Sequence, residues 1–298
     1  MNGIYRFYQD GKLVGMSKNL LTTEGQRLIL RYLAGQAPNI GAAIGLGVGT
    51  TAANVADTNL EFEVHRVPVA LRNVDYTNDV VLFKATIDQT EIFKIYEAGL
   101  WSDASNVLSG QYDSKVLTTF DLLEEEWNDV VADTTQERIG EDAMRVDVLA
   151  SATVSTAIDV DFDFSGYSVN DEFSLAFYKP NNNIASIALV FTDTATTGTL
   201  ELVKTVSALP VGYNILKFKK GDFVVTGTIS WTNVSKMGFD VTAGGTGGYV
   251  VLDSLRIEDT DTPNQDFVLV SRSVLGAPIE KTDVAPMDVE YALEFNVS

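Results

Sequence analysis

The stretch GLGVGTT, residues 45–51, decides between two fold classes for the first part of the chain. Glycine-rich stretches of this kind either cradle a phosphate between a strand and a helix or let a strand pack closely on its neighbours. A phosphate-binding loop needs a helix directly after its glycines, and the P-loop also needs a lysine. No lysine follows Gly49, and residues 50–59 lack helical periodicity. We therefore expect a closely packed strand and no nucleotide site.

The strongest helix signal lies before these glycines, in residues 22–35. Thr22 or Thr23 can cap the helix, and Gly35 supplies the stop. The apolar side chains that fall on one helical face are Leu28, Ile29, Tyr32 and Leu33. Residues 3–16 form a hairpin around Asp10-Gly11, because Asp-Gly between alternating apolar runs favours a two-residue turn.

The remainder of the chain is rich in strand patterns, so we predict a mainly β fold. Residues 60–76 alternate, and Pro68 indicates an edge strand or a bend. Residues 113–264 contain short strands at regular spacing with turn residues between them, which is typical of an antiparallel β-sandwich. The polar linker EDTDTPNQD, residues 258–266, precedes a return to long strands.

Composition limits the partners of this chain. It has 298 residues, 45% of them hydrophobic, and a formal net charge of -20, which argues against binding nucleic acid or an anionic membrane. Cysteine is absent, which excludes disulfides and thiolate chemistry. The opening residues lack the pattern of a signal peptide, and no apolar window has the length of a membrane-spanning helix. We expect a chain made in a cytoplasm and not inserted into a membrane.

Four stretches resemble virion proteins of tailed bacteriophages. They are NLLTTEGQRLILRYLAG (19–35), IGAAIGLGVGTTAANVADTNLEFEVHRVPV (40–69), YEAGLWSDASNVLSG (96–110) and LVSRSVLGAPIEKTDVAPMDVEYALEF (269–295). The last stretch is similar to closing strands that normally follow the third stretch directly. The resemblance implies a discontinuous virion-assembly domain, residues 1–112 with 265–298, in which the strands around 107–110 and 267–272 pair.

The inserted residues 113–264 resemble a second family, the jelly-roll carbohydrate-binding modules. The similar stretches are TTFDLLEEEWNDV (118–130), RIGEDAMRVDV (138–148) and ISWTNVSKMGFDVTAGGTGGYVVLDSLRI (229–257). One departure is Ser254, which stands where those modules usually have a second aspartate. A jelly roll places its first and last strands side by side, so such a domain fits into a host hairpin with little disturbance.

The second resemblance implies two sites. Acids on the opening and closing strands would hold a structural calcium ion; the matching residues are Asp121, Glu141 and Asp253. Exposed tyrosines would stack on sugar rings; the candidates are Tyr167, Tyr178, Tyr213 and Tyr249. Ordinary strand-end acids and core or rim aromatics are the alternatives for these two sets. Trp127 and Trp231 match positions that are usually buried.

No catalytic arrangement emerges from the sequence, so we expect a protein that is not an enzyme. His65 is the only histidine and lies in a strand pattern beside Arg66. Asp159, Asp161 and Asp163 alternate with apolar residues, which indicates a solvated strand face. The acidic run 124–126 consists of sequence neighbours, whereas glycoside hydrolysis needs two carboxyls facing each other across the substrate.

We therefore predict a homo-oligomeric structural component of a tailed-phage virion, in the tail, baseplate, fibre base or collar. Its partners would be other virion proteins and a host-surface glycan bound by the exposed β-sandwich. Two alternatives stay open at this point. The insert is a spacer or decoration that binds no ligand, or the chain is a glycan-degrading enzyme.

Overall fold

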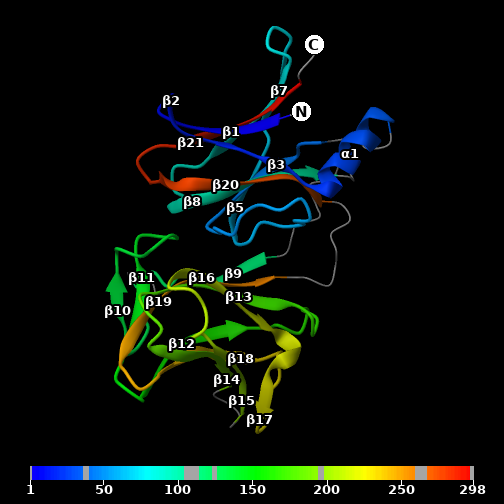
Figure 1. The fold of residues 1–298 in the computed structure, drawn as a ribbon. Coiled ribbons are helices and arrows are strands. Elements are labelled where there is room, and N and C mark those ends of the chain that lie inside the picture. Colours follow the sequence, from blue (N-terminus) through cyan, green and yellow to red (C-terminus); the bar gives the residue numbers. More distant parts are fainter. Residues whose placement is uncertain are drawn as a thin grey trace. The chain divides into compact units, whose positions relative to one another are not determined.

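The computed structural model describes residues 2–35, 40–103, 114–122, 126–193, 198–258 and 267–295. The chain divides into two compact units (Figure 1). The first unit combines Met1–Tyr112 with Asn264–Ser298, and the second is Asp113–Pro263. Both are built from antiparallel strands, and the helix α1 (Thr23–Leu33) belongs to the first unit. The chain is therefore mainly β with a discontinuous first unit, as the sequence predicts.

Two five-stranded sheets form the first unit, in the orders β2-β1-β21-β7-β6 and β3-β20-β8-β4-β5. The strands of the first sheet are β1 (Asn2–Gln9), β2 (Lys12–Lys18), β6 (Leu71–Asp75), β7 (Val80–Ile87) and β21 (Met287–Glu294). Those of the second are β3 (Leu20–Leu21), β4 (Ala43–Gly47), β5 (Glu63–Pro68), β8 (Phe93–Asp103) and β20 (Phe267–Lys281). Apolar side chains of both sheets, such as Tyr5, Phe7 and Leu100, share one core. Pro68 ends β5, an edge strand, where its missing N–H removes little from the ladder.

The last strands close the first unit onto its opening hundred residues. Strand β21 lies between β1 and β7, and β20 pairs with β8 from Phe267 opposite Asp103 onward. The closure follows from hydrogen bonding, because neither sheet is continuous without the C-terminal strands. The expected pairing of residues 107–110 lies outside the described residues.

Local signals produce the hairpin and the helix. Asp10 and Gly11 have φ of 50° and 71°, which a tight two-residue turn requires. Thr22 caps α1 by accepting a hydrogen bond from the Gly25 N–H at 2.9 Å. The expected apolar face of the helix is only half buried, and this part of the prediction is corrected. Leu28 and Ile29 enter the core, whereas Tyr32 and Leu33 are 46% and 75% exposed, because no element covers the last turn on that side among the described residues.

The glycines of residues 45–49 serve close packing. A Cβ atom on Gly47 would lie 2.3 Å from the Phe62 carbonyl oxygen, and one on Gly49 would lie 2.5 Å from Glu97 Oε1. The Gly49 N–H itself donates to that carboxylate. The only helix of the described first unit precedes these glycines. The strand interpretation is confirmed for Gly45 and Gly47, which lie in β4, whereas residues 48–51 follow that strand in a loop.

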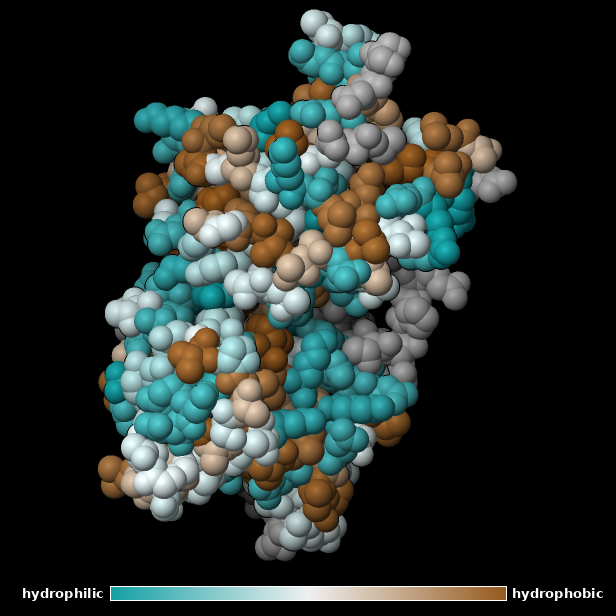
Figure 2. Space-filling model, viewed as in Figure 1, coloured by the Kyte–Doolittle hydropathy of each residue, from teal (hydrophilic) through white to brown (hydrophobic). Residues whose placement is uncertain are grey.

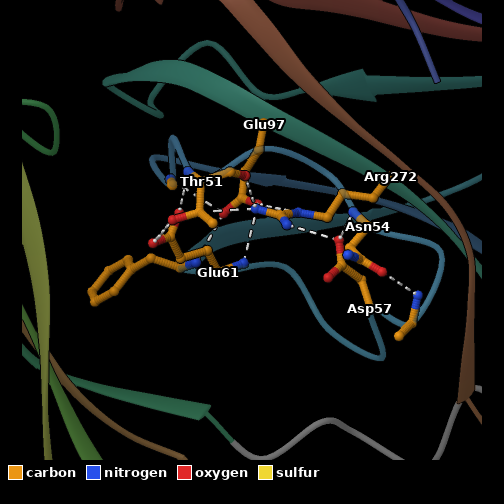
Figure 3. A network of polar contacts seen from close by, with 9 residues as sticks. Thr51, Asn54, Asp57, Glu61, Glu97 and Arg272 are labelled. Atoms are coloured by element: carbon orange, nitrogen blue, oxygen red, sulfur yellow. Dashed lines mark hydrogen bonds and ion pairs between the residues drawn. The ribbon is translucent and has the colours of Figure 1, made fainter. Parts of the chain in front are cut away.

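A buried carboxylate organises the loop that follows (Figure 3). Glu97 is fully buried on β8 and accepts hydrogen bonds from the N–H groups of Glu61 and Phe62 as well as Gly49. Arg272 of β20 donates to Glu97 Oε2 at 2.9 Å through Nε, and its Nη1 lies 2.8 Å from Asp57 Oδ2. These contacts fix residues 48–61 to β8 and β20.

The charge state of this carboxylate depends on two opposing effects. Burial raises the pKa of Glu97, and the Arg272 guanidinium beside it lowers that pKa. The N–H donors of Phe62 and Glu61 act in the same direction as Arg272. The ion pair and its hydrogen bonds therefore offset part of the cost of taking the carboxylate out of water.

The second unit is a β-sandwich. One sheet has the order β10-β11-β19-β13-β16, with β9 also paired to β19, and the other has the order β12-β18-β14-β15-β17. The strands of the first are β9 (Ser114–Thr118), β10 (Val131–Asp133), β11 (Ala143–Val148), β13 (Glu172–Lys179), β16 (Gly212–Lys219) and β19 (Gly248–Glu258). Those of the second are β12 (Thr153–Phe162), β14 (Ile184–Thr192), β15 (Thr199–Thr205), β17 (Val224–Thr226) and β18 (Val234–Ala243); a short 3-10 helix, η1, spans Lys220–Asp222.

The first and last strands of the second unit are neighbours, as expected for a jelly roll. Strand β9 pairs with β19, with Ser114 opposite Glu258. Trp127 lies in the core between the sheets, and Trp231 is half-buried against it. The two ends of this unit therefore leave the sandwich at adjacent positions. Across the described residues, no helix is long and apolar enough to span a bilayer.

Gly47→Ala tests the packing role of the glycine-rich strand. The added methyl group meets backbone and the Glu97 carboxylate, so we expect a loss of about 1–3 kcal/mol in the unfolding free energy of the first unit. Gly166→Ala is the matched control, because a Cβ there enters open space. Hydrogen exchange of β8 and β20 measures the effect, with β14 as internal reference. Equal protection in both variants would contradict this packing role.

Candidate functional site

Three of the four candidate tyrosines lie on one face of one sheet in the second unit. Tyr178 of β13 is opposite Tyr213 of β16 and, on its other side, opposite Val251 of β19. Tyr249 lies two residues before Val251 on β19. The neighbouring residue Phe177 points into the core, so alternation directs these tyrosines to the outer side. Tyr178, Tyr213 and Tyr249 are called the tyrosine face below.

Arginine side chains cover two of these rings. The Arg145 guanidinium lies 3.9 Å from the centroid of the Tyr249 ring, and that of Arg138 lies 3.5 Å from the centroid of Tyr213. Arg145 is also held by Asp147 at 2.7 Å, and Asp147 is opposite Tyr249 in the strand register. Cation–π contacts of this kind fix the orientation of a ring at a surface.

A β-bulge aims a buried acid at this face. The register between β13 and β19 shifts after Ala176, and Asp253 is the extra residue. Its carboxylate accepts the N–H groups of Arg138 at 3.1 Å and Ile139 at 3.3 Å, and the Tyr213 hydroxyl donates to it. Burial raises the pKa of Asp253 to about 7, although these donors oppose the shift. Asp253 therefore positions Tyr213 and titrates near neutrality.

Tyr167 lies apart from the tyrosine face. It follows β12 in a turn and packs half-buried against the core of the sandwich, with its ring centroid 6.3 Å from that of Phe164. Its carbonyl oxygen accepts a hydrogen bond from the Lys220 ammonium. This tyrosine belongs to the packing of the turn, which was the alternative reading of the aromatic candidates.

The three expected calcium ligands are not brought together. Asp253 is committed to Tyr213 and two backbone donors, and Glu141 is exposed. Asp121 is buried near Asp142, whose carboxylate accepts the Leu122 N–H at 2.9 Å. Within the described parts of the chain, no group of three or more His, Asp or Glu side chains is arranged to hold a metal ion.

In place of the three expected calcium ligands, the structure brings two acids close together, Asp121 and Asp142. Burial raises the pKa of Asp142, and the charges of Asp121 and Glu137 raise it further. A Cβ on Gly140 would lie 3.5 Å from Asp121 Oδ2 and 3.9 Å from the Asp142 carbonyl oxygen, so acid and carbonyl oxygens face the same space. Two carboxylates and carbonyl oxygens are ligands that calcium accepts, although calcium usually takes six to eight oxygens.

The residues considered for catalysis are dispersed. His65 lies on β5 with Nδ1 3.7 Å from Glu91 Oε2, and its ring centroid is 6.0 Å from that of Phe93. Asp159, Asp161 and Asp163 are all exposed along and just after β12, as their alternation predicts. Glu124 and Glu125 lie outside the described residues, and Glu126 is exposed.

Comparisons with known proteins find similarity at the level of structure. No protein-family model matches the chain, and no curated protein matches it significantly. Similar solved structures are carbohydrate-binding modules with a β-sandwich fold. A family 11 module from Clostridium thermocellum, in complex with a beta-1,3-1,4-mixed-linked tetrasaccharide, is 13% identical with a TM-score of 0.39, and the match covers 49% of this chain and 95% of the module.

A second module and an enzyme give matches of similar extent. The module CBM27-1 from Caldicellulosiruptor saccharolyticus, in complex with mannohexaose, is 14% identical with a TM-score of 0.36, and the match covers 51% of this chain and 100% of that one. The agarase AgWH50C is 12% identical with a TM-score of 0.35, and only 24% of the enzyme is covered. Similarities of this extent assign neither a ligand nor an activity to the chain.

The raised pKa of Asp253 predicts how the second unit responds to pH. An aspartate in the unfolded chain titrates near 3.9, so the folded state binds this proton more tightly. The resulting stability is complete below pH 3.9 and is lost as the pH rises through about 7. Between pH 5.5 and 8 we expect the second unit to lose about 2 kcal/mol through this group.

Asp253→Asn isolates that contribution. The variant has no titrating carboxyl at this position, so the difference in unfolding free energy between the natural protein and the variant should change with pH. Chemical denaturation at several pH values, followed by hydrogen exchange of β14 in the second unit, measures it. A difference that is constant from pH 5.5 to 8 would disprove the assignment.

Asp142→Asn tests the charge repulsion in the acid pair. Burial and the charges of Asp121 and Glu137 raise the pKa of Asp142, so the ionised carboxyl is unfavourable there. At neutral pH we therefore expect the variant to be no less stable than the natural protein, as measured by its unfolding free energy in chemical denaturation. Asp161→Asn, an exposed acid, is the control. A clear loss of stability in the Asp142 variant alone would contradict the repulsion.

Proposed function

We propose that the second unit binds glycan chains through the tyrosine face and does not cleave them. The observation that carries this proposal is the placement of Tyr178, Tyr213 and Tyr249 on the same side of three adjacent strands. Adjacent strands are about 4.8 Å apart, so the three strands extend over roughly 10 Å. Aromatic rings spaced along such a row suit an extended chain of sugar rings, whose apolar faces stack on aromatic faces.

The polar groups beside the rings favour an uncharged glycan. Arg145 and Asp147 neutralise each other next to Tyr249, and Arg138 lies beside the Asp253 carboxylate. Paired charges of this kind donate and accept hydrogen bonds with sugar hydroxyls, whereas an anionic ligand would have to displace an existing carboxylate. The overall net charge of -20 also repels polyanions.

We further propose that the first unit assembles into the particle of a tailed bacteriophage and carries the second unit with it. The support is the set of resembling stretches, which coincide with α1, β4, β5, β8, β20 and β21 of the first unit. Several copies on one particle would strengthen individually weak glycan contacts, because linked binding events raise the effective concentration.

A purely structural second unit is the other candidate, and one observation favours it. The guanidinium groups on Tyr213 and Tyr249 cover a ring face that a sugar would otherwise use. On that reading the arginines complete a surface that binds no ligand. Tyr178 distinguishes the two candidates. No arginine is stacked on its ring within the described part of the chain, so no arginine competes there with a sugar.

Tyr178→Ala and Tyr249→Ala test glycan binding. Mixed-linked beta-1,3-1,4-glucan and mannohexaose, the ligands present with two of the similar modules, serve as first probes within a wider glycan array. We expect each variant to bind about three- to tenfold more weakly in titration calorimetry, the equivalent of losing one aromatic contact. Tyr76→Ala is the matched control, an 86% exposed tyrosine of the first unit.

The outcomes separate the candidates. Binding by the natural protein that neither variant weakens would move the site away from the tyrosine face. Absence of binding across the array, with the protein displayed in many copies, would favour the structural candidate. Release of shorter sugars from any probe would overturn the proposal that the chain is not an enzyme.

A further inference from the structure

The first sheet of the first unit ends in two strands that lack an outer neighbour. Within the described ranges, β2 pairs only with β1, and β6 pairs only with β7. Both edges present apolar side chains to solvent. Leu13, Val14 and Met16 on β2 are 52%, 47% and 69% exposed, and Leu71 and Val74 on β6 are 54% and 44% exposed. Natural proteins usually protect such edges, because an open edge recruits another strand.

The two edges run in the same direction. Four antiparallel pairings separate β2 from β6 in the order β2-β1-β21-β7-β6, so the direction reverses four times. When β6 of one molecule is placed beside β2 of another in a continued sheet, the two strands are therefore parallel. Both strands are long enough for several ladder bonds, with five and seven residues.

The side-chain pattern of the two edges matches across such a junction. Lys18 and Met16 lie opposite Ile4 and Arg6, on the side away from the core residues Tyr5 and Phe7. On β6, Arg72 lies opposite the core residue Phe83, so Leu71, Asn73 and Asp75 are on the side away from the core. A continued sheet therefore places Leu71 on the same face as Met16, and Asp75 on the same face as Lys18.

Charge is also complementary at the two edges. β2 begins and ends with lysine, Lys12 and Lys18, and both are exposed. The β6–β7 hairpin carries Asp75 and Asp79, and the Arg72 side chain of β6 is turned to the Gly41 carbonyl oxygen at 2.8 Å and 3.0 Å. A basic β2 edge facing an acidic β6–β7 hairpin favours pairing β2 of one copy with β6 of the next. Pairing β2 with β2 of another copy would bring lysines together.

Apolar surface continues beside β6. A groove of about 540 Å³ lies between the last turn of α1 and the sheet, and its lining includes Tyr32, Leu33, Val74, Tyr76 and Leu293. Apolar residues gather over α1 in Figure 2. A strand added to β6 would extend the sheet that forms the floor of this groove, and it would remove part of the exposed apolar area from water.

We propose that copies of this chain assemble head to tail, with β2 of one copy added to the β6 edge of the next. The interface is heterologous, so repetition generates a closed ring or an open fibre. This inference deepens the proposed assembly role of the first unit. Its test contains no glycan, so its failure leaves the result for the tyrosine face unchanged.

Two edge variants and their mixture test the arrangement. The double variant Met16→Lys with Lys18→Glu damages the β2 edge, and Leu71→Lys damages the β6 edge; all three side chains are exposed, so folding should persist and circular dichroism checks it. In sedimentation velocity the natural chain should form species larger than a dimer as concentration rises. Each variant should sediment as a monomer, and an equimolar mixture should form a one-to-one dimer and nothing larger.

A variant of the second unit serves as the control for the edge variants. Val203→Lys replaces an exposed apolar residue of the second unit, 52% exposed, and should assemble like the natural chain. Dimers of the β2-edge variant alone would indicate a symmetric β6–β6 pair and overturn the proposal. A natural chain that stays monomeric at every concentration, or variants that assemble normally, would overturn it as well.

Discussion

The hydrogen-bonded ion pair of Glu97 and Arg272 joins the two separated segments of the first unit. Glu97 precedes the inserted sandwich and Arg272 follows it, and their strands β8 and β20 are neighbours in one sheet. The carboxylate is buried and also accepts the N–H groups of Gly49 and Phe62, which lie near the two ends of the loop. Removing either partner would leave a buried charge with only its remaining contacts, the backbone N–H donors for Glu97 or Asp57 for Arg272, which is more costly than losing an exposed ion pair. This contact therefore links the glycine-rich stretch and the loop after it to the sheet that the two separated segments form.

The tyrosine face depends on a different constraint, the pairing of β13 with β19. Their register sets Tyr178 beside Val251 and, through β16, beside Tyr213. The bulge at Asp253 then brings a carboxylate under the Tyr213 hydroxyl without interrupting the inward row of apolar side chains. Because the bulge directs the Asp253 carboxylate to Tyr213, this acid of the closing strand positions a surface ring. It therefore does not join the pair of Asp121 and Asp142.

Several features could be predicted from the sequence because they are encoded locally or by repeated alternation. The Asp10-Gly11 turn, the Thr22 cap and the outward Asp159, Asp161 and Asp163 are of this kind. The strand patterns predicted the sandwich, whereas the discontinuous body was implied by the resemblance of residues 269–295 to closing strands that normally come earlier in the chain. The sequence could name the candidate tyrosines but not which of them cluster, because the order of strands in the sheet decides which strands are neighbours. Tyr167 looks like the others in sequence, yet it lies in a turn that packs on the core.

The pair of Asp121 and Asp142 shows the same limit of prediction from sequence, here in the choice between two adjacent residues. Glu141 and Asp142 are adjacent, and the turn before β11 exposes the first and buries the second, which no periodic pattern announces. The role of Asp142 becomes visible only from its neighbours in the structure, the buried Asp121 and the half-buried Leu122, whose N–H it accepts. The apolar groove beside α1 was likewise hidden in the sequence, because Tyr32 and Leu33 match a buried helical stripe.

The pairing of β9 with β19 has a consequence for how such a protein diversifies. The sandwich begins and ends on neighbouring strands, and the host strands β8 and β20 are themselves partners where the insert departs. A different self-contained module with adjacent ends can therefore replace residues 113–263 without altering a single ladder bond of the first unit. Recombination at these two points would exchange one inserted module for another while the scaffold that carries it stays constant.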